Sequence, residues 1–419
     1  MRKMRLGTKI MLKRLAIAGG ALFVVGMTGL IASVTANDDF LAQTLAYADE
    51  KTKPTQSTPV VHPVEVDSNI HFSMSDITWE GDTAWVRLAD GRKARLTLRK
   101  DLMDNMDRSF SEHPVPYGGG VAVDPSTGRI LAISSASNAK PTIEDYALRA
   151  VAPSASVFKL VTSAALLEKD AVDPQATVCY SGGASMLTES DVRGNPNTDN
   201  LCRSLEYAIG HSTNAIIARL AYQHLSREDL ESIALKFGFN REIPFELPLD
   251  ISSAEFVEDD IERAKTAAGF WHVNLSPFHG ALLAAAIIND GVMMRPTLVD
   301  AIYDTAGNVT YTMQPKPWSV VMTADHAKTL AQLAQNTTRE GTAKKAFSGR
   351  KGWKKGVVTG GKTGTLSNKL PFYTFNWYVG WGVLNEDKFA VGSVVVNTEK
   401  WWIKGTNVAS RVMGLYFHE

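Results

Sequence analysis

The stretch PSASVFKLVTSAALLE at residues 153–168 decides the fold of this chain. Pro153 ends the preceding segment, and apolar residues recur at helical spacing directly after Ser156, so a helix is predicted to begin close to this serine. Lys159 follows one turn later on the same helix face. A lysine whose pKa is lowered by burial and a nearby cation can take the proton of a serine hydroxyl, and a helix N-terminus offers a backbone N–H to the oxyanion that forms. The segment therefore predicts a nucleophilic serine with its base.

Two further short segments carry hydroxyl, amide and amine groups that could complete such a site. STN at 212–214 lies between two helical stretches, where a turn would present its hydroxyl and amide to a cleft. KTGT at 362–365 follows two glycines and precedes the C-terminal strands. Taken alone, S-x-x-K reads as a helix cap with a solvated lysine, and STN reads as an interhelical turn. Their common order along one chain is far more specific than either segment by itself.

Residues 356–363, GVVTGGKT, also satisfy the P-loop pattern G-x-x-x-x-G-K-[ST]. A P-loop needs a buried strand before it and a helix after it, so that backbone amides and the helix dipole hold phosphate. The preceding GRKGWKK at 349–355 is too charged for a core strand, and the following GTLSNKLP at 364–371 cannot form a helix. We therefore expect no nucleotide phosphate site here.

S-x-x-K, S-x-N and K-T-G in this order are the signature of penicillin-binding proteins and serine β-lactamases, and the chain resembles their transpeptidase domain. The resemblance extends from about residue 118 to 398. It includes VAVDPSTGRILA at 121–132, LSPF at 275–278, GTA at 341–343 and WYVG at 377–380. Two departures, Phe278-His279 in place of Leu-Gln and Phe270-Trp271 where glycines are common, are expected to reshape the substrate groove.

The resemblance implies a serine acyl-enzyme that needs no metal or organic cofactor. Ser156 would be the nucleophile, Lys159 its general base, and Lys362 the cation that attracts the substrate carboxylate and tunes the base. Ser212 would relay a proton to the leaving amine, and Asn214 would position the substrate amide. The remaining implied roles are substrate binding by Thr363, Gly364 and Thr365, and an oxyanion hole formed by the N–H groups of Ser156 and Thr365.

The resemblance and the hydrophobic pattern together predict an α+β fold, with an antiparallel sheet flanked by helices plus an all-helical subdomain. Residues 84–98 alternate around an Asp-Gly pair, which is a strong hairpin signal, and a short helix is expected over 100–110. Residues 118–135 predict a second hairpin. The middle of the chain is helical by periodicity, and strand character returns in 374–384 and 388–398.

The N-terminus has the composition of a membrane anchor. Residues 1–14 carry six Lys and Arg and no acid, and residues 15–34 then run without a charge. Twenty residues at about 1.5 Å each span roughly the hydrocarbon core of a bilayer. We expect a cytoplasmic basic tail, one transmembrane helix in the cell inner membrane, and a catalytic domain in the periplasm or outside the cytoplasmic membrane. A cleaved signal peptide is the alternative, although its apolar stretch is usually shorter.

The remaining chain divides by composition. A polar linker is expected over 35–59, a small N-terminal region with a hairpin over 60–117, and the transpeptidase domain over 118–419. Lys plus Arg number 44 and Asp plus Glu also number 44, which argues against a nucleic-acid partner. The two cysteines, Cys179 and Cys202, could form a disulfide in an exported domain or remain as buried thiols.

The resemblance implies a peptidoglycan D,D-transpeptidase that cross-links stem peptides and is acylated by β-lactams. A D,D-carboxypeptidase or a class D-like β-lactamase would use the same acyl-enzyme, but no E-x-x-L-N segment is present for rapid deacylation. A non-catalytic β-lactam-binding scaffold is disfavoured because every motif position is filled. A separate glycan-polymerising membrane protein is expected as partner, since about 80 residues before Gly118 are too few for a glycosyltransferase domain.

Overall fold

The computed structural model describes residues 70–419, except 184–185, 350 and 370. The described residues belong to one compact unit, Pro63–Glu419. The predicted basic tail, transmembrane anchor and linker lie outside the described residues. Within the described part of the chain, no helix is both long and apolar enough to cross a membrane.

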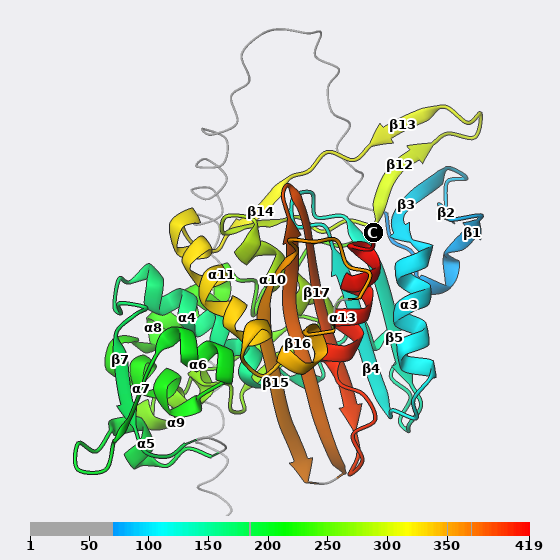
Figure 1. Cartoon of the computed structure of the whole chain (residues 1–419). Helices are drawn as coiled ribbons and strands as arrows, with labels where there is room; N and C mark the ends of the chain where they lie inside the picture. Colours follow the sequence, from blue (N-terminus) through cyan, green and yellow to red (C-terminus); the bar gives the residue numbers. More distant parts are fainter. Residues whose placement is uncertain (1–69, 184–185, 350, 370) are drawn as a thin grey trace, which may run out of the picture. The chain divides into compact units, whose positions relative to one another are not determined.

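A five-stranded antiparallel sheet with the order β15-β16-β17-β4-β5 forms the centre of the fold (Figure 1). Its strands are β4 (Tyr117–Val123), β5 (Ile130–Ser137), β15 (Val358–Lys369), β16 (Phe372–Leu384) and β17 (Asp387–Asn397). The hairpin predicted over 118–135 is confirmed as β4 and β5. The C-terminal strand β17 pairs with β4, with Val391 opposite Ala122, so segments far apart in the sequence close the sheet.

Helices cover both faces of this sheet because its strands alternate apolar side chains between two cores. In β17, Val394 belongs to the core that contains α10 (Pro277–Ile288). Its neighbour Val395 belongs to the second core, which contains α3 (Lys100–Ser111) and α13 (Gly405–Tyr416). The predicted antiparallel sheet flanked by helices is thereby confirmed.

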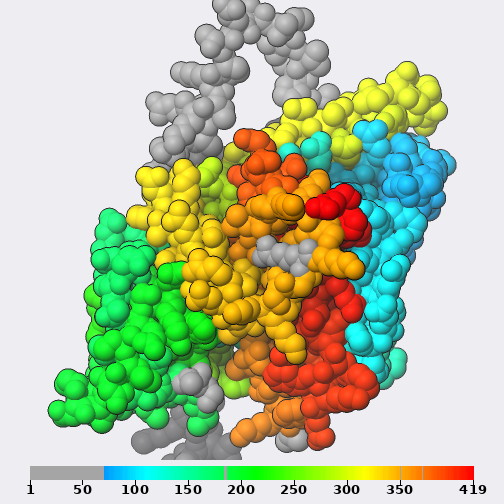
Figure 2. All heavy atoms as spheres, viewed as in Figure 1, coloured from blue at the N-terminus to red at the C-terminus, as the bar shows by residue number. Residues whose placement is uncertain are grey.

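A helical subdomain lies beside the C-terminal strands of the central sheet (Figures 1 and 2). Its helices are α4 (Lys159–Glu168), α5 (Glu189–Arg193), α6 (Leu205–His211), α7 (Asn214–His224), α8 (Arg227–Lys236) and α9 (Asp260–Ala267). A further helix, α11 (Ala324–Arg339), packs against α4 and α6 on one side and β15 on the other. The short α12 (Lys344–Phe347) follows it. The edge strand β15 therefore faces the helical subdomain, and the groove described below lies between the two.

The expectation of an all-helical subdomain is wrong, because a two-stranded sheet of β7 (Thr177–Tyr180) and β8 (Leu201–Ser204) belongs to it. Cys179 and Cys202 lie opposite each other in it and form a disulfide. β8 runs directly into α6, which ends at the predicted site residue Ser212. The disulfide therefore holds the strand from which this part of the site is built.

The small region before the central sheet contributes to a second five-stranded sheet, with the order β1-β2-β3-β12-β13. Its strands are β1 (Thr78–Glu80), β2 (Thr83–Arg87), β3 (Lys93–Arg99), β12 (Val299–Tyr303) and β13 (Val309–Thr312). The predicted hairpin over 84–98 and the helix over 100–110 are confirmed as β2, β3 and α3. Because β3 pairs with β12 and Arg95 forms an ion pair with Asp300 at 2.6 Å, this region shares its sheet with the rest of the chain.

The remaining short elements connect these sheets and lead into the functional site. They are η1 (Met74–Asp76), η2 (Tyr146–Leu148), β6 (Ala152–Pro153), η3 (Ala155–Phe158), β9 (Ser253–Ala254), β10 (Val273–Leu275), β11 (Val292–Met294) and β14 (Pro317–Val320). β6, β10 and β9 pair in one small sheet. This sheet holds the chain immediately before Ser156.

The expectation that Phe278 and His279 reshape the substrate groove is wrong. Both residues lie in α10 and are buried, and neither lines the groove described below. Phe278 packs against Phe245, with ring centroids 4.4 Å apart. The Nε2 of His279 donates a hydrogen bond to Phe237 O at 2.7 Å. These departures from the family pattern therefore change the core under the sheet.

The buried imidazole of His279 should make the folded chain less stable in mild acid. Burial lowers the pKa of His279 from 6.5 to about 4, so the unfolded chain takes up a proton between these values while the folded chain does not. We expect the free energy of unfolding to fall by about 3 kcal/mol as the pH drops from 6.5 to 4. Urea unfolding of the full-length chain across this range measures the effect. His279→Gln, which does not titrate, should lose most of this pH dependence; an unchanged dependence would contradict the assignment.

Candidate active site

Ser156 lies in the short helical turn η3, directly before α4. The sequence predicted a helix start here, and the structure places the serine in a 3-10 turn, with Lys159 as the first residue of the α-helix. Ala155 adopts a left-handed backbone with φ of 47°, which costs an L-residue about 1–2 kcal/mol. Trp377 Nε1 donates to Pro153 O at 2.8 Å and ties the turn to β16. The surrounding structure therefore holds the serine in a strained turn.

Lys159 is fully buried beneath Ser156. Its Nζ lies 2.6 Å from Ser156 Oγ, 2.7 Å from Asn214 Oδ1 and 2.5 Å from Ala268 O. Burial, and then the charge of Lys362, hold the pKa of Lys159 well below its usual 10.5. The amine can therefore exist in its neutral form next to the serine hydroxyl.

Lys362 is the second buried lysine, and it comes from β15. Its Nζ donates to Thr363 O at 2.9 Å. Burial lowers the pKa of Lys362 to about 7. The protonated and neutral forms of Lys362 are therefore both populated near neutral pH. When Lys362 is protonated, its positive charge disfavours a second positive charge on Lys159.

Ser212 and Asn214 are presented by the sharp junction between α6 and α7. Ser212 ends α6 in a left-handed conformation with φ of 61°, and Asn214 begins α7. Thr213 N donates to Ala208 O at 2.9 Å, which closes the end of α6. The two polar side chains therefore reach the site from one turn, as the predicted interhelical turn required.

The KTGT segment lies in the edge strand β15, and this excludes the P-loop interpretation, because residues 360–363 are part of a strand. Gly364 lies against the serine turn: a Cβ there would be 3.2 Å from the Cβ of Ala155. Thr363 Oγ1 lies 2.6 Å from Thr342 Oγ1. The strand edge is therefore close to Ser156, with its hydroxyls on the open side.

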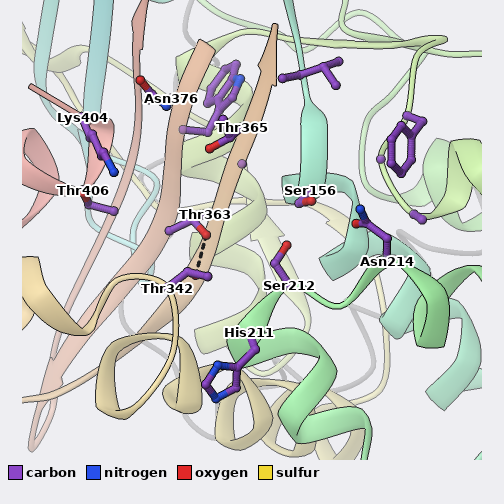
Figure 3. A pocket seen from close by; sticks show the side chains of 16 residues that line it. Ser156, His211, Ser212, Asn214, Thr342, Thr363, Thr365, Asn376, Lys404 and Thr406 are labelled. Carbon is purple, nitrogen blue, oxygen red and sulfur yellow. Dashed lines mark hydrogen bonds between the residues drawn. The ribbon is translucent and has the colours of Figure 1, made fainter. Parts of the chain in front are cut away.

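A cavity of about 490 Å³ lies between β15 and the helical subdomain (Figure 3). The predicted site residues that line it are Ser156, Ser212, Asn214, Thr363, Gly364 and Thr365. The predicted residues Lys159 and Lys362 lie buried behind this wall, whereas Cys179 and Cys202 do not line the cavity. The three motifs therefore meet at one groove.

Further residues line the same groove and were not predicted as site residues: His211, Ala268, Gly269, Phe270, Thr342, Leu366, Asn376, Trp377, Lys404 and Thr406. Three of them had a signal in the sequence, since Thr342 lies in the GTA segment, Trp377 opens the WYVG segment and Phe270 replaces a common glycine. The others belong to no motif. Among the described residues, no group of three or more His, Cys, Asp or Glu side chains is placed to hold a metal ion.

Gly269 is predicted to be essential for the position of Ser156. It has φ of 94°, and a Cβ at this position would lie 2.2 Å from Ala155 O. Gly269→Ala must therefore displace the serine turn, and a shift of about 1 Å in a reacting group can lower a rate about 100-fold. Gly307→Ala is a matched control, because Gly307 also has a left-handed φ but has nothing within 4 Å. Acylation rates that fall equally in both variants, or in neither, would contradict the prediction.

Comparison with known proteins identifies the family of the chain. A model of the penicillin binding protein transpeptidase domain matches residues 118–413. The chain belongs to this family. The peptidoglycan D,D-transpeptidase PbpA of Mycolicibacterium smegmatis is 27% identical over 311 residues, which are 66% of this chain and 61% of the relative. PbpA of Mycobacterium tuberculosis H37Rv is 26% identical over 315 residues, covering 67% of this chain and 62% of the relative. The chain therefore spans about three fifths of the length of these relatives.

Solved structures of penicillin-binding proteins share the fold. A ceftriaxone acyl-enzyme complex of penicillin-binding protein A from M. tuberculosis superposes with a TM-score of 0.65 at 22% identity, covering 78% of this chain and 80% of the other. The D,D-transpeptidase domain of a peptidoglycan glycosyltransferase from Eggerthella lenta has a TM-score of 0.63 at 22% identity, covering 80% of this chain and 94% of the other. The predicted α+β transpeptidase fold is confirmed.

Proposed function

We propose that this family member is a peptidoglycan D,D-transpeptidase that cross-links stem peptides through an acyl-enzyme at Ser156, and that β-lactams acylate the same serine. The observation that carries the proposal is the buried amine of Lys159, 2.6 Å from Ser156 Oγ. Relatives with the same family domain are named peptidoglycan D,D-transpeptidases, and similar folds are described as acyl-enzyme complexes with ceftriaxone, imipenem and penicillin G.

Lys159 acts as general base in the proposed mechanism. In its neutral form the amine has two N–H groups and one lone pair. The two N–H groups donate to Asn214 Oδ1 and Ala268 O, so the lone pair faces Ser156 Oγ and accepts the hydroxyl proton. The serine oxygen then attacks the carbonyl carbon of the bond between the two terminal D-alanines.

The strand and turn residues serve the remaining steps. The backbone N–H groups of Ser156 and Thr365 stabilise the oxyanion, at about 3 kcal/mol for each donor in comparable sites. Ser212 passes the proton to the leaving amine as the peptide bond breaks. Thr363, together with the positive charge of Lys362, holds the carboxylate of the leaving D-alanine. An acceptor amine then attacks the acyl-enzyme and releases the cross-linked product.

The proposal also includes the domain boundaries of the enzyme and its location at the membrane. Residues 15–34 anchor the chain in the inner membrane, 35–59 form the linker, 60–117 form the N-terminal region and 118–419 form the transpeptidase domain in the periplasm. The charge-free run of twenty residues after a basic tail supports the anchor. A separate membrane protein would polymerise the glycan strands, because the family model that matches this chain is that of a transpeptidase domain.

Acylation by a fluorescent penicillin tests the proposal. The full-length chain should form one long-lived covalent adduct that maps to Ser156 by mass spectrometry, and Ser156→Ala should abolish it. Ser190→Ala, an exposed serine on α5, is the matched control and should leave the adduct unchanged. A folded chain that forms no adduct would overturn the proposal in favour of a non-catalytic scaffold.

The fate of the acyl-enzyme separates the related activities. With a stem peptide ending in D-Ala-D-Ala and an acceptor amine, a transpeptidase yields the cross-linked peptide as its main product. Predominant transfer to water would instead assign a D,D-carboxypeptidase. A short-lived adduct with rapid turnover of the drug would assign a β-lactamase.

A further inference from the structure

Beyond Thr365, the wall of the groove continues onto β16 and the first turn of α13. Asn376 from β16, and Lys404 and Thr406 at the start of α13, line the same cavity as Ser156. Figure 3 shows these three side chains gathered on the far side of Thr365 from Ser156. No part of the proposed mechanism uses them.

Asn376 is only 2% exposed, and its amide orientation is determined by Asn397. Asn397 Oδ1 accepts a hydrogen bond from Trp402 N at 3.1 Å, and its Nδ2 donates to Ile403 O at 2.9 Å. Because these backbone groups define which end of Asn397 is the donor, its Nδ2 also donates to Asn376 Oδ1, at 2.8 Å. Asn376 Nδ2 is therefore the free end, and it has no hydrogen-bond partner among the described residues. A buried donor without a partner is costly, and a bound ligand would satisfy it.

The start of α13 adds positive charge to the wall that contains the Asn376 amide donor. The aligned peptide dipoles of this 12-residue helix give its N-terminus a positive partial charge, which favours anions. Its N-cap residue, Lys404, makes no side-chain capping bond, and its ammonium lies 4.7 Å from the ring centroid of Trp401. Thr406 adds a hydroxyl donor to the same wall. A cation, a hydroxyl and an amide donor together form a set that suits a carboxylate.

We propose that Lys404, Thr406 and Asn376 form an anion-binding subsite beside Thr365 that takes a carboxylate of the peptide substrate. This proposal rests on the transpeptidase function proposed above. In that reaction the D-alanine that leaves and the amino acid whose amine attacks pass through the same side of the groove, since the second transfer reverses the first. The carboxylate is therefore either the C-terminal carboxylate of the donor peptide, which would then be shared between Thr363 and this subsite, or the carboxylate next to the acceptor amine.

Calorimetric binding to the full-length Ser156→Ala chain tests the subsite without turnover. One arm compares a donor peptide ending in D-Ala-D-Ala carboxylate with its C-terminal carboxamide. The other compares an acceptor D-amino acid with its carboxamide. We expect Lys404→Met to raise the Kd of the carboxylate ligand that occupies the subsite about fivefold. The Kd of its carboxamide should stay within about twofold of the value for the chain with Lys404. Effects of this size are typical of one exposed charge-assisted contact. Lys404→Arg should retain most of the affinity.

Lys400→Met is the matched control. Lys400 comes from the same loop and lies over the ring of Trp402, with its Nζ 3.4 Å from the ring centroid, but it does not line the cavity. A second variant, Asn376→Asp, keeps the acceptor for Asn397 but replaces the amide donor with a negative charge, so it should weaken carboxylate binding further.

The arm that responds to Lys404→Met identifies the source of the carboxylate. Equal effects on carboxylate and carboxamide, an equal effect of Lys400→Met, or no effect in either arm would overturn the subsite. Acylation of the wild-type chain by fluorescent penicillin is measured alongside. A missing adduct at Ser156 would defeat the proposed function, whereas the binding arms decide the subsite independently.

Discussion

Replacing Lys159 by methionine should lower the rate of acylation by a fluorescent penicillin about 1,000-fold, within the range that a general base contributes. Methionine fills a similar volume but offers no lone pair to the hydroxyl of Ser156, 2.6 Å from the lysine Nζ. Asn214 Oδ1 and Ala268 O would also lose the donor that now satisfies them. The second-order rate of adduct formation at Ser156, measured at pH 7, gives the effect directly.

Lys169→Met serves as the control for this experiment. Lys169 follows the same helix, α4, but its side chain is exposed and pairs with Asp229 at 2.6 Å. We expect its acylation rate to stay within about twofold of the wild type, since exposed ion pairs contribute little. If Lys159→Met kept more than a tenth of the wild-type rate, the base would have to be sought elsewhere, with Ser212 as the next candidate.

Replacing Lys362 by methionine should inactivate the enzyme and stabilise its fold. Burial holds the pKa of Lys362 at about 7 in the folded chain, against 10.5 for a free lysine. At pH 7 and below, the folded chain bears the full cost of keeping this charge buried, and methionine removes it. We expect the free energy of unfolding to rise by about 4 kcal/mol at pH 7, as measured by urea unfolding of the full-length chain.

The pH dependence distinguishes this cause from ordinary packing. Between pH 7 and 10.5 the unfolded lysine is still protonated while the folded one is neutral, so the wild type becomes more stable relative to the variant as the pH rises. The advantage of Lys362→Met should therefore shrink across this interval. Lys369→Met, an exposed position on the same strand β15, should show no such trend. A variant that is less stable than the wild type at pH 7 would contradict the prediction.

Much of the fold followed from local patterns. The Asp-Gly pair and the DPSTG turn lie between alternating apolar runs, so the two N-terminal hairpins were predictable from short-range geometry. Phe278 and His279 were not, because their place in the core depends on how α10 packs against distant aromatic residues such as Phe245. The resemblance to the family singled out Phe278 and His279 in the sequence. Whether their side chains are buried depends on the residues that the fold places around them.

For the site, the sequence alone predicted which groups would do the chemistry, because S-x-x-K places Ser156 and Lys159 one turn apart and the KTGT segment completes the family pattern. Only the tertiary structure decided what those groups can do. It buries Lys159 against Ala268 O, lowers its pKa with a lysine two hundred residues away, and sets Asn376 and Lys404 beside Thr365. Spacing along a chain determines local geometry, whereas burial and long-range charge arise only when distant segments meet.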